Sequence, residues 1–139
     1  PYMQEYKEKL DQLRSVPTEY WIYACGPVPA NPSRRFRELP IYSSIYDMDG
    51  CCYWTTYYLY PRGAEDNTGH YGFFYKMPDG SVEWQAGLND YVILELGKNG
   101  DTKEQVKAIH DYALKHLTAP DFWANYTKMR ADLLRALNK

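Results

Sequence analysis

The sequence predicts one α+β domain over residues 1–139, with an N-terminal helix, a curved antiparallel sheet of five to six strands, and two C-terminal helices packed on that sheet. Three observations support this prediction. The length of 139 residues is typical of a single domain. Aromatic residues make up 17% of the chain and include 15 Tyr, and strands are enriched in aromatic residues. Helical spacing of apolar residues appears at the two ends of the chain, whereas β-type runs fill its middle.

The chain begins with a predicted helix over residues 2–15, which is followed by a predicted strand. Large apolar residues recur at helical spacing: Tyr2, Tyr6, Leu10 and Leu13. Pro17 ends the helical pattern because it lacks a backbone donor. Residues 18–25 (TEYWIYAC) are dense in aromatic and β-branched side chains, so we expect them to form the first strand.

Residues 26–40 are predicted to be a long irregular segment. They contain four prolines, which fix φ and remove donors: Pro27, Pro29, Pro32 and Pro40. Long ordered loops are often functional, and arginines surround Phe36. Arg35 and Phe36 are therefore candidate binding residues. The alternative is a solvated linker or a short helix capped by Ser33.

The middle of the chain is predicted to consist of hairpin-linked strands. Turn residues separate five runs, over residues 41–46, 51–60, 70–77, 81–85 and 91–96. Short turns make sequential strands antiparallel neighbours. Because both faces of the first two runs carry aromatic or apolar residues, helices should cover both faces, or the sheet should curl around a tyrosine-lined concavity.

Two helices are predicted at the C-terminal end. Thr102 and Gln105 have the spacing of a capping box at the start of the first helix. Its predicted buried stripe consists of Val106, Ile109, Ala113 and Leu117. Pro120 suits the first turn of the second helix, where a missing donor costs little. The apolar face of this second helix consists of Phe122, Tyr126, Met129, Leu133 and Leu137.

Charge and hydropathy exclude two classes of partner. The net charge is −2, and residues 17–97, which hold the predicted sheet, carry five basic and ten acidic side chains. A phosphate backbone would be repelled by that segment, so we expect no nucleic-acid partner. No apolar run approaches the ~18 residues that a bilayer span needs, so we expect no membrane association.

The cysteines and histidines point to a cytoplasmic protein without metal or cofactor. Three cysteines, two of them adjacent at Cys51 and Cys52, do not form a disulfide framework, and reduced thiols are typical of the cytoplasm. His110 and His116 are six residues apart, about 240° around a helix, so they cannot chelate one ion together. No motif for a cofactor is present.

These observations favour a non-enzymatic binding module that uses a tyrosine-rich sheet face to engage a protein partner or a small apolar ligand. Tyr and Arg are enriched at protein interfaces, and the sequence contains no coherent catalytic set. The candidate binding residues are Arg35, Phe36, Tyr42, Tyr46, Trp54 and Tyr58.

Two alternatives remain open. The first is a small-molecule hydrolase, lyase or isomerase with its site in a tyrosine-lined cavity closed by the C-terminal helices. Its candidate catalytic residues are Cys52 as nucleophile and His70 as acid or base, because predicted neighbouring strands would carry them. The second is a homo-oligomer whose subunits meet through exposed aromatic residues.

Overall fold

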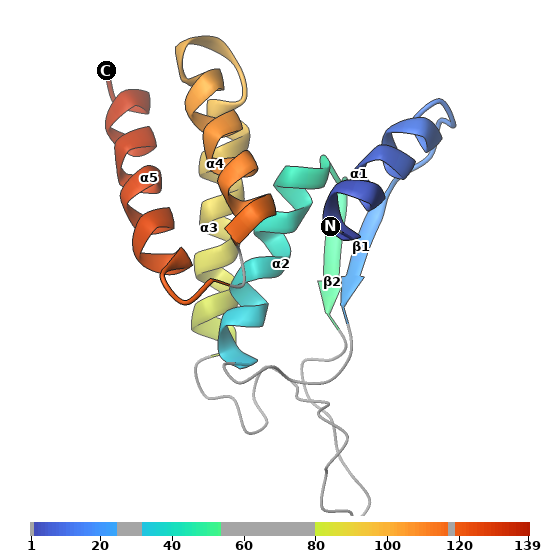
Figure 1. Ribbon diagram of the computed structural model, residues 1–139, viewed down its shortest axis with the longest axis horizontal. Helices are drawn as coiled ribbons and strands as arrows, with labels where there is room; N and C mark the ends of the chain where they lie inside the picture. The colour runs from blue at the N-terminus through green and yellow to red at the C-terminus, as the bar shows by residue number, and fades with distance from the viewer. Residues whose placement is uncertain (1, 25–31, 54–79, 117–118) are drawn as a thin grey trace, which may run out of the picture. The chain divides into compact units, whose positions relative to one another are not determined.

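The computed structural model describes residues 2–24, 32–53, 80–116 and 119–139, and these residues are mostly helical (Figure 1). The elements in chain order are α1 (Tyr2–Leu13), β1 (Trp21–Ala24), α2 (Pro32–Tyr46), β2 (Gly50–Tyr53), α3 (Gly80–Gly97), the short 3-10 helix η1 (Gly100–Thr102), α4 (Lys103–His116) and α5 (Phe122–Leu137). They form two compact units, one spanning residues 19–89 and the other combining residues 1–18 with residues 90–139.

The unit of residues 19–89 contains a β-α-β arrangement. Strands β1 and β2 are parallel, with Trp21 opposite Gly50 and Tyr23 opposite Cys52. Figure 1 shows the two arrows side by side and pointing the same way. Helix α2 connects the strands and contacts both of them. Parallel strands require such a crossover, because the chain must return to the end of the sheet at which the first strand began.

The predicted five- to six-stranded antiparallel sheet is therefore wrong. Residues 41–46 lie in α2, and residues 81–85 and 91–96 lie in α3. The runs at residues 18–25 and 51–60 do contain β1 and β2, but the two strands pair in parallel. The tyrosine-lined concavity inferred from that sheet loses its basis. The predicted strand at residues 70–77 lies outside the described residues.

The error in α2 has a clear physical cause. Every residue from Leu39 to Tyr46 except Tyr42 is buried, so the helix has no polar face in this stretch. A helix that is buried on all sides shows no 3.6-residue periodicity, and its β-branched and aromatic residues then resemble a strand. Pro40 lies inside this helix and is itself buried, against the usual exclusion of proline from helix interiors.

The predicted irregular segment at residues 26–40 is helical from Pro32 onward, so the short helix considered as an alternative is present and longer than expected. Pro32 occupies the first helical position, where its missing donor costs little. The structure describes the backbone of Ser33 and not its side chain.

Helix α2 ends where the sequence predicted a hairpin turn. Asp47 has a φ of 55°, the left-handed conformation that closes many helices. The Asp47 amide donates to the Ser44 carbonyl (3.3 Å) and the Met48 amide donates to the Ser43 carbonyl (2.8 Å). These two bonds form a Schellman motif, which leads the chain directly from α2 into β2.

In the unit that contains both ends of the chain, the predicted helices are confirmed. Helix α1 ends at Leu13, shortly before Pro17. The Thr102 hydroxyl donates to the Gly97 carbonyl (3.0 Å) and lies in η1, directly before α4. The core of this unit combines residues of both predicted stripes with one residue of α3: Leu94, Val106, Ile109, Ala113, Phe122, Tyr126 and Leu133. Met129 and Leu137 are half-buried, and Leu117 lies outside the described residues.

Among the described helices, none is both long enough and apolar enough to cross a bilayer.

Candidate functional site

Four of the six predicted binding residues lie on α2. Phe36 and Tyr46 are buried, so both side chains belong to the core of their unit. Tyr42 is half-buried and stacks on Tyr46, with ring centroids 6.2 Å apart and planes inclined by 19°. Burial raises the pKa of Tyr46 above its ordinary value of 10.0. Arg35 lies in α2, and its side chain is not described.

Of the remaining predicted site residues, Cys52 lies on β2. Trp54, Tyr58 and His70 lie outside the described residues. The pairing of Cys52 with His70 therefore stays a prediction. Of the predicted binding residues that the structure describes, Tyr42 and Tyr46 stack on each other, and this contact is largely internal.

The two adjacent cysteines on β2 have different environments. Cys51 is half-buried, and burial raises its thiol pKa above the ordinary value of 9.0. The neighbouring Cys52 adds to this rise in pKa, whereas a hydrogen bond with Ser43 of α2 acts in the opposite direction. A raised pKa lowers the thiolate fraction at neutral pH, which disfavours Cys51 as a nucleophile. Cys52 is exposed and points to the other face of the strand pair.

The exposed aromatic surface of this unit lies on β1, at residues outside the predicted binding set. Trp21 is 58% exposed and Tyr23 is 52% exposed. They are two residues apart, so they share one face of the strand pair with Gly50 and Cys52. We call these four residues the aromatic strand face. A Cβ added at Gly50 would lie 2.7 Å from Cε3 of Trp21, so the indole ring lies directly over this glycine.

Polar contacts hold the start of this face in place. The Asp49 amide donates to the Tyr20 carbonyl (2.9 Å), and the Asp49 carboxylate accepts from the Tyr20 amide (2.7 Å). This reciprocal pair extends the β1–β2 register by one residue. The indole Nε1 of Trp21 donates to the Glu19 carboxylate (3.1 Å), which restrains the orientation of the ring. These hydrogen bonds therefore restrain the backbone and the Trp21 ring at the start of the aromatic strand face.

The sequence contained a signal for this face. In the run TEYWIYAC, period-2 alternation places Trp21 and Tyr23 together and puts Ile22 on the opposite side. Ile22 is less exposed than either aromatic residue, and its cross-strand partner Cys51 contacts Ser43 of α2. Trp21 and Tyr23 can be identified as exposed only if residues 32–46 are known to form the crossover helix α2, which packs on the Ile22 side. The sequence predicted a loop and a strand for these residues.

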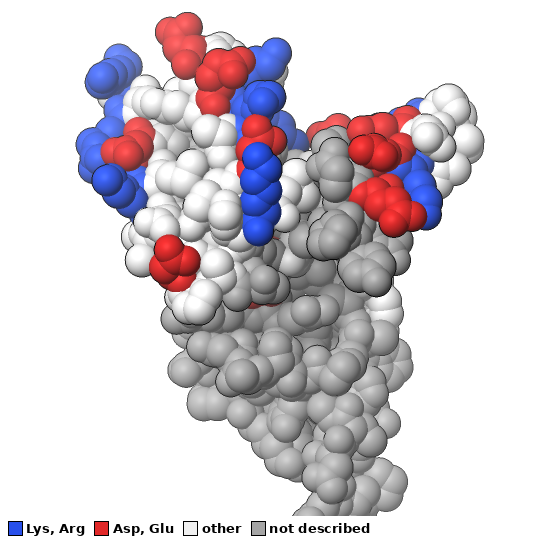
Figure 2. Space-filling view, viewed as in Figure 1, with Lys and Arg blue, Asp and Glu red and all other residues white. Residues whose placement is uncertain are grey.

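Charged side chains in the other unit pair mainly with close neighbours along a helix. The pairs include Glu5 with Lys9 (2.6 Å) and Lys107 with Asp111 (3.0 Å). In Figure 2 the displayed face carries Lys and Arg interspersed with Asp and Glu. Within the described ranges, no group of three or more His, Cys, Asp or Glu residues lies close enough to hold a metal ion. These charges have the arrangement expected of solvated helix surfaces.

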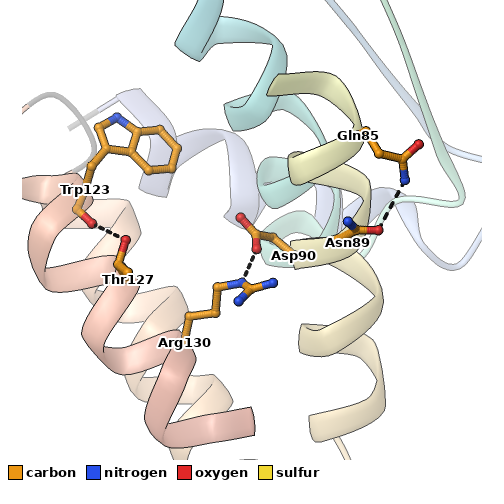
Figure 3. A network of polar contacts seen from close by, with 6 residues as sticks. All are labelled: Gln85, Asn89, Asp90, Trp123, Thr127 and Arg130. Carbon is orange, nitrogen blue, oxygen red and sulfur yellow. Dashed lines mark hydrogen bonds and ion pairs between the residues drawn. The ribbon is translucent and has the colours of Figure 1, made fainter. Parts of the chain in front are cut away.

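One ion pair differs from these because it is internal. The Asp90 side chain on α3 is completely buried, and its carboxylate accepts from Nε of Arg130 on α5. Figure 3 shows the two side chains pointing toward each other. The Arg130 side chain is 27% exposed, so it reaches the surface while the Asp90 carboxylate does not. The ion pair joins the part of α3 that begins at Asp90 to α5 within one unit.

Comparisons with protein-family models, with curated proteins and with solved structures found no match to this chain. Its function must be inferred from its own residues.

Proposed function

We propose that this chain is a non-enzymatic binding module that engages a protein partner through the aromatic strand face. The observation that carries the proposal is the exposure of Trp21 and Tyr23, on one face, in a unit whose α2 aromatics Phe36 and Tyr46 are buried. Large aromatic residues left in solvent expose apolar area that a partner can cover.

Trp and Tyr are also the residue types that contribute most at protein interfaces. The Trp21 ring is held over Gly50 and by Glu19, so little side-chain freedom remains to be lost on binding. Cys52 adds a small, weakly polar side chain beside Tyr23. A restrained Trp ring beside an exposed Tyr favours recognition of a protein surface.

A protein partner suits this face better than a small ligand does. Ligand sites are concave and enclose most of the ligand surface. Trp21 and Tyr23 are each more than half exposed, so they offer an open surface. Arg35 and Tyr42 belong to α2, which covers the opposite side of the strand pair, so they would not extend this face, whereas Trp54 and Tyr58 stay candidate contacts.

Cys52 provides a direct test because it lies on the face itself. A thiol-reactive photo-crosslinker placed on Cys52, with Cys25 and Cys51 replaced by Ser, should give discrete adducts with a partner in extract of the source cells. The substitution Trp21→Ala should abolish these adducts, and the purified partner should bind the wild-type chain at least about tenfold more tightly than the variant.

The matched control places the same crosslinker at Val16→Cys. Val16 is 52% exposed and lies outside the aromatic strand face, so this probe should give none of the same adducts. Circular dichroism confirms that each variant keeps its helices. Adducts that survive Trp21→Ala, or that form equally from position 16, would show that the face does not carry the interaction.

A further inference from the structure

The chain passes from α3 to η1 through the dipeptide Asn99-Gly100, and both residues are exposed. Asn99 has an extended backbone (φ −116°, ψ 154°), and its side chain makes no capping hydrogen bond to η1. Gly100 has a φ of 75°, and a Cβ added there would meet no atom within 4 Å. Among the described residues, none accepts a hydrogen bond from the Gly100 amide. A side-chain amide and the backbone amide that follows it therefore lie together in an open turn.

This pair of groups has a defined reaction in water. The backbone nitrogen of the following residue gives up its proton to solvent and attacks Cγ of the asparagine. The N–Cγ bond forms and the Cγ–Nδ2 bond breaks, so that Nδ2 takes a proton from solvent and leaves as ammonia. The product is a cyclic imide. Water then adds to one of its two carbonyl carbons and breaks the bond from that carbon to nitrogen, which leaves either aspartate or isoaspartate.

We propose that Asn99 is a modification site of this kind, which deamidates spontaneously through an imide formed with Gly100. Asparagine is among the chemically labile residues, and holding two reacting groups on adjacent residues makes the first step intramolecular. Glycine lacks a Cβ and adopts a wide range of backbone conformations, so it hinders the attack of its own nitrogen least. The reaction places a carboxylate at the start of η1 and makes the formal net charge of −2 more negative by one unit.

The other asparagines that the structure describes are also exposed, but hydrogen bonds hold each of their side chains. Oδ1 of Asn89 accepts from Nε2 of Gln85 (3.2 Å), as Figure 3 shows. Nδ2 of Asn125 donates to the Asp121 carboxylate (3.1 Å), and Nδ2 of Asn138 donates to a carbonyl oxygen of α5 (3.0 Å). None of these three is followed by glycine. Exposure alone therefore does not distinguish Asn99, whereas its open turn and the glycine after it do.

The chain offers a matched position in a closed environment, at Asp49 and Gly50. The Asp49 carboxylate accepts from the Tyr20 amide (2.7 Å), and a Cβ added at Gly50 would lie 2.7 Å from Cε3 of Trp21. The substitution Asp49→Asn creates the same dipeptide there and keeps a side-chain oxygen that can accept from Tyr20. Imide formation at position 49 requires this hydrogen bond to break, so its rate should be lower than at position 99.

Incubation of the folded Asp49→Asn variant at neutral pH and physiological temperature compares the two positions in one molecule. Peptide mapping by electron-transfer mass spectrometry identifies aspartate and isoaspartate at each position. We expect both products at position 99, formed at least about tenfold faster than at position 49. In urea the two positions should convert at equal rates, because the local structure that separates them is lost. Circular dichroism establishes that the variant is folded before the incubation.

Two measurements on other forms of the chain complete the test. Hydroxylamine cleaves cyclic imides, so it should cut the folded wild-type chain between residues 99 and 100. The wild-type chain should also develop a more acidic species on isoelectric focusing, and Asn99→Gln should abolish it, because the longer side chain must close a larger ring. An Asn99 that stays intact through the incubation would overturn the proposal. Equal rates at positions 49 and 99 in the folded variant would also overturn it, because the open turn would then contribute nothing.

Discussion

Removal of Arg130 should be the most destabilising single change at the buried ion pair. In Arg130→Met the fully buried Asp90 carboxylate loses its guanidinium partner. Breaking a buried pair from one side costs about 3–5 kcal/mol. Because Arg130 is partly exposed, we expect the lower end, about 3 kcal/mol. With a urea m-value of about 1–3 kcal/mol/M, the unfolding midpoint should fall by about 1–3 M.

The opposite truncation should cost less. In Asp90→Asn the remaining guanidinium can turn to solvent, so the expected loss is about 1–2 kcal/mol. The double variant Asp90→Asn with Arg130→Met should be more stable than Arg130→Met alone, because no buried charge is left. Urea unfolding followed by circular dichroism measures all three values. The exposed pair of Lys107 and Asp111 is the control, and Asp111→Asn should leave the midpoint unchanged within error.

Equal losses for Asp90→Asn and Arg130→Met would refute this reasoning, because they would show that the buried charge is not the dominant cost. Losses near zero for both would show that Asp90 is solvated in solution.

Three other predictions concern single positions. Gly87→Ala should lower the free energy of unfolding in urea by about 1–3 kcal/mol, because the new Cβ meets the Arg37 backbone. Gly100→Ala should lower it by about 1 kcal/mol, because Gly100 has a φ of 75° although a Cβ there meets no atom within 4 Å. Asp49→Ala should cost about 1.5–3 kcal/mol because the Tyr20 amide loses its carboxylate acceptor, and an equally stable variant would show that water replaces the bond. The free energy of unfolding should fall as the pH rises above about 9, because the folded chain holds the Cys51 proton more tightly than the unfolded chain does. The stabilisation from this proton is complete below the pKa of Cys51 in the unfolded chain and is lost as the pH rises through its pKa in the folded chain. Cys51→Ala should remove this slope between pH 9 and 10 and Cys52→Ala should keep it, while the raised pKa of Tyr46 acts in the same direction only above 10.0.

The helices whose solvated face is polar could be predicted from the sequence, and those without a polar face could not. The stripes of α4 and α5 place Val106, Ile109, Phe122 and Leu133 in the core, as their spacing indicated. Apolar spacing did not predict α3, because its exposed side carries Val82, Val92 and Leu96. Apolar residues therefore occur all around this helix. The continuous run YVILEL then resembles a buried strand, and only its place in an 18-residue helix distinguishes the two.

The same distinction explains why the open aromatic face was missed. The candidate aromatic residues were predicted from the surplus of Tyr and from strands with aromatic residues on both faces, and neither feature separates a ring in the core from a ring in solvent. Tyr46 and Trp21 both occur in aromatic runs, yet Tyr46 lies on the crossover helix and is buried, whereas Trp21 lies on β1 and is exposed. Which ring is exposed depends on the parallel pairing of β1 with β2, a contact between residues about thirty positions apart. Exposure is thus a tertiary property, and for this chain it marks the surface proposed to bind a partner, the aromatic strand face.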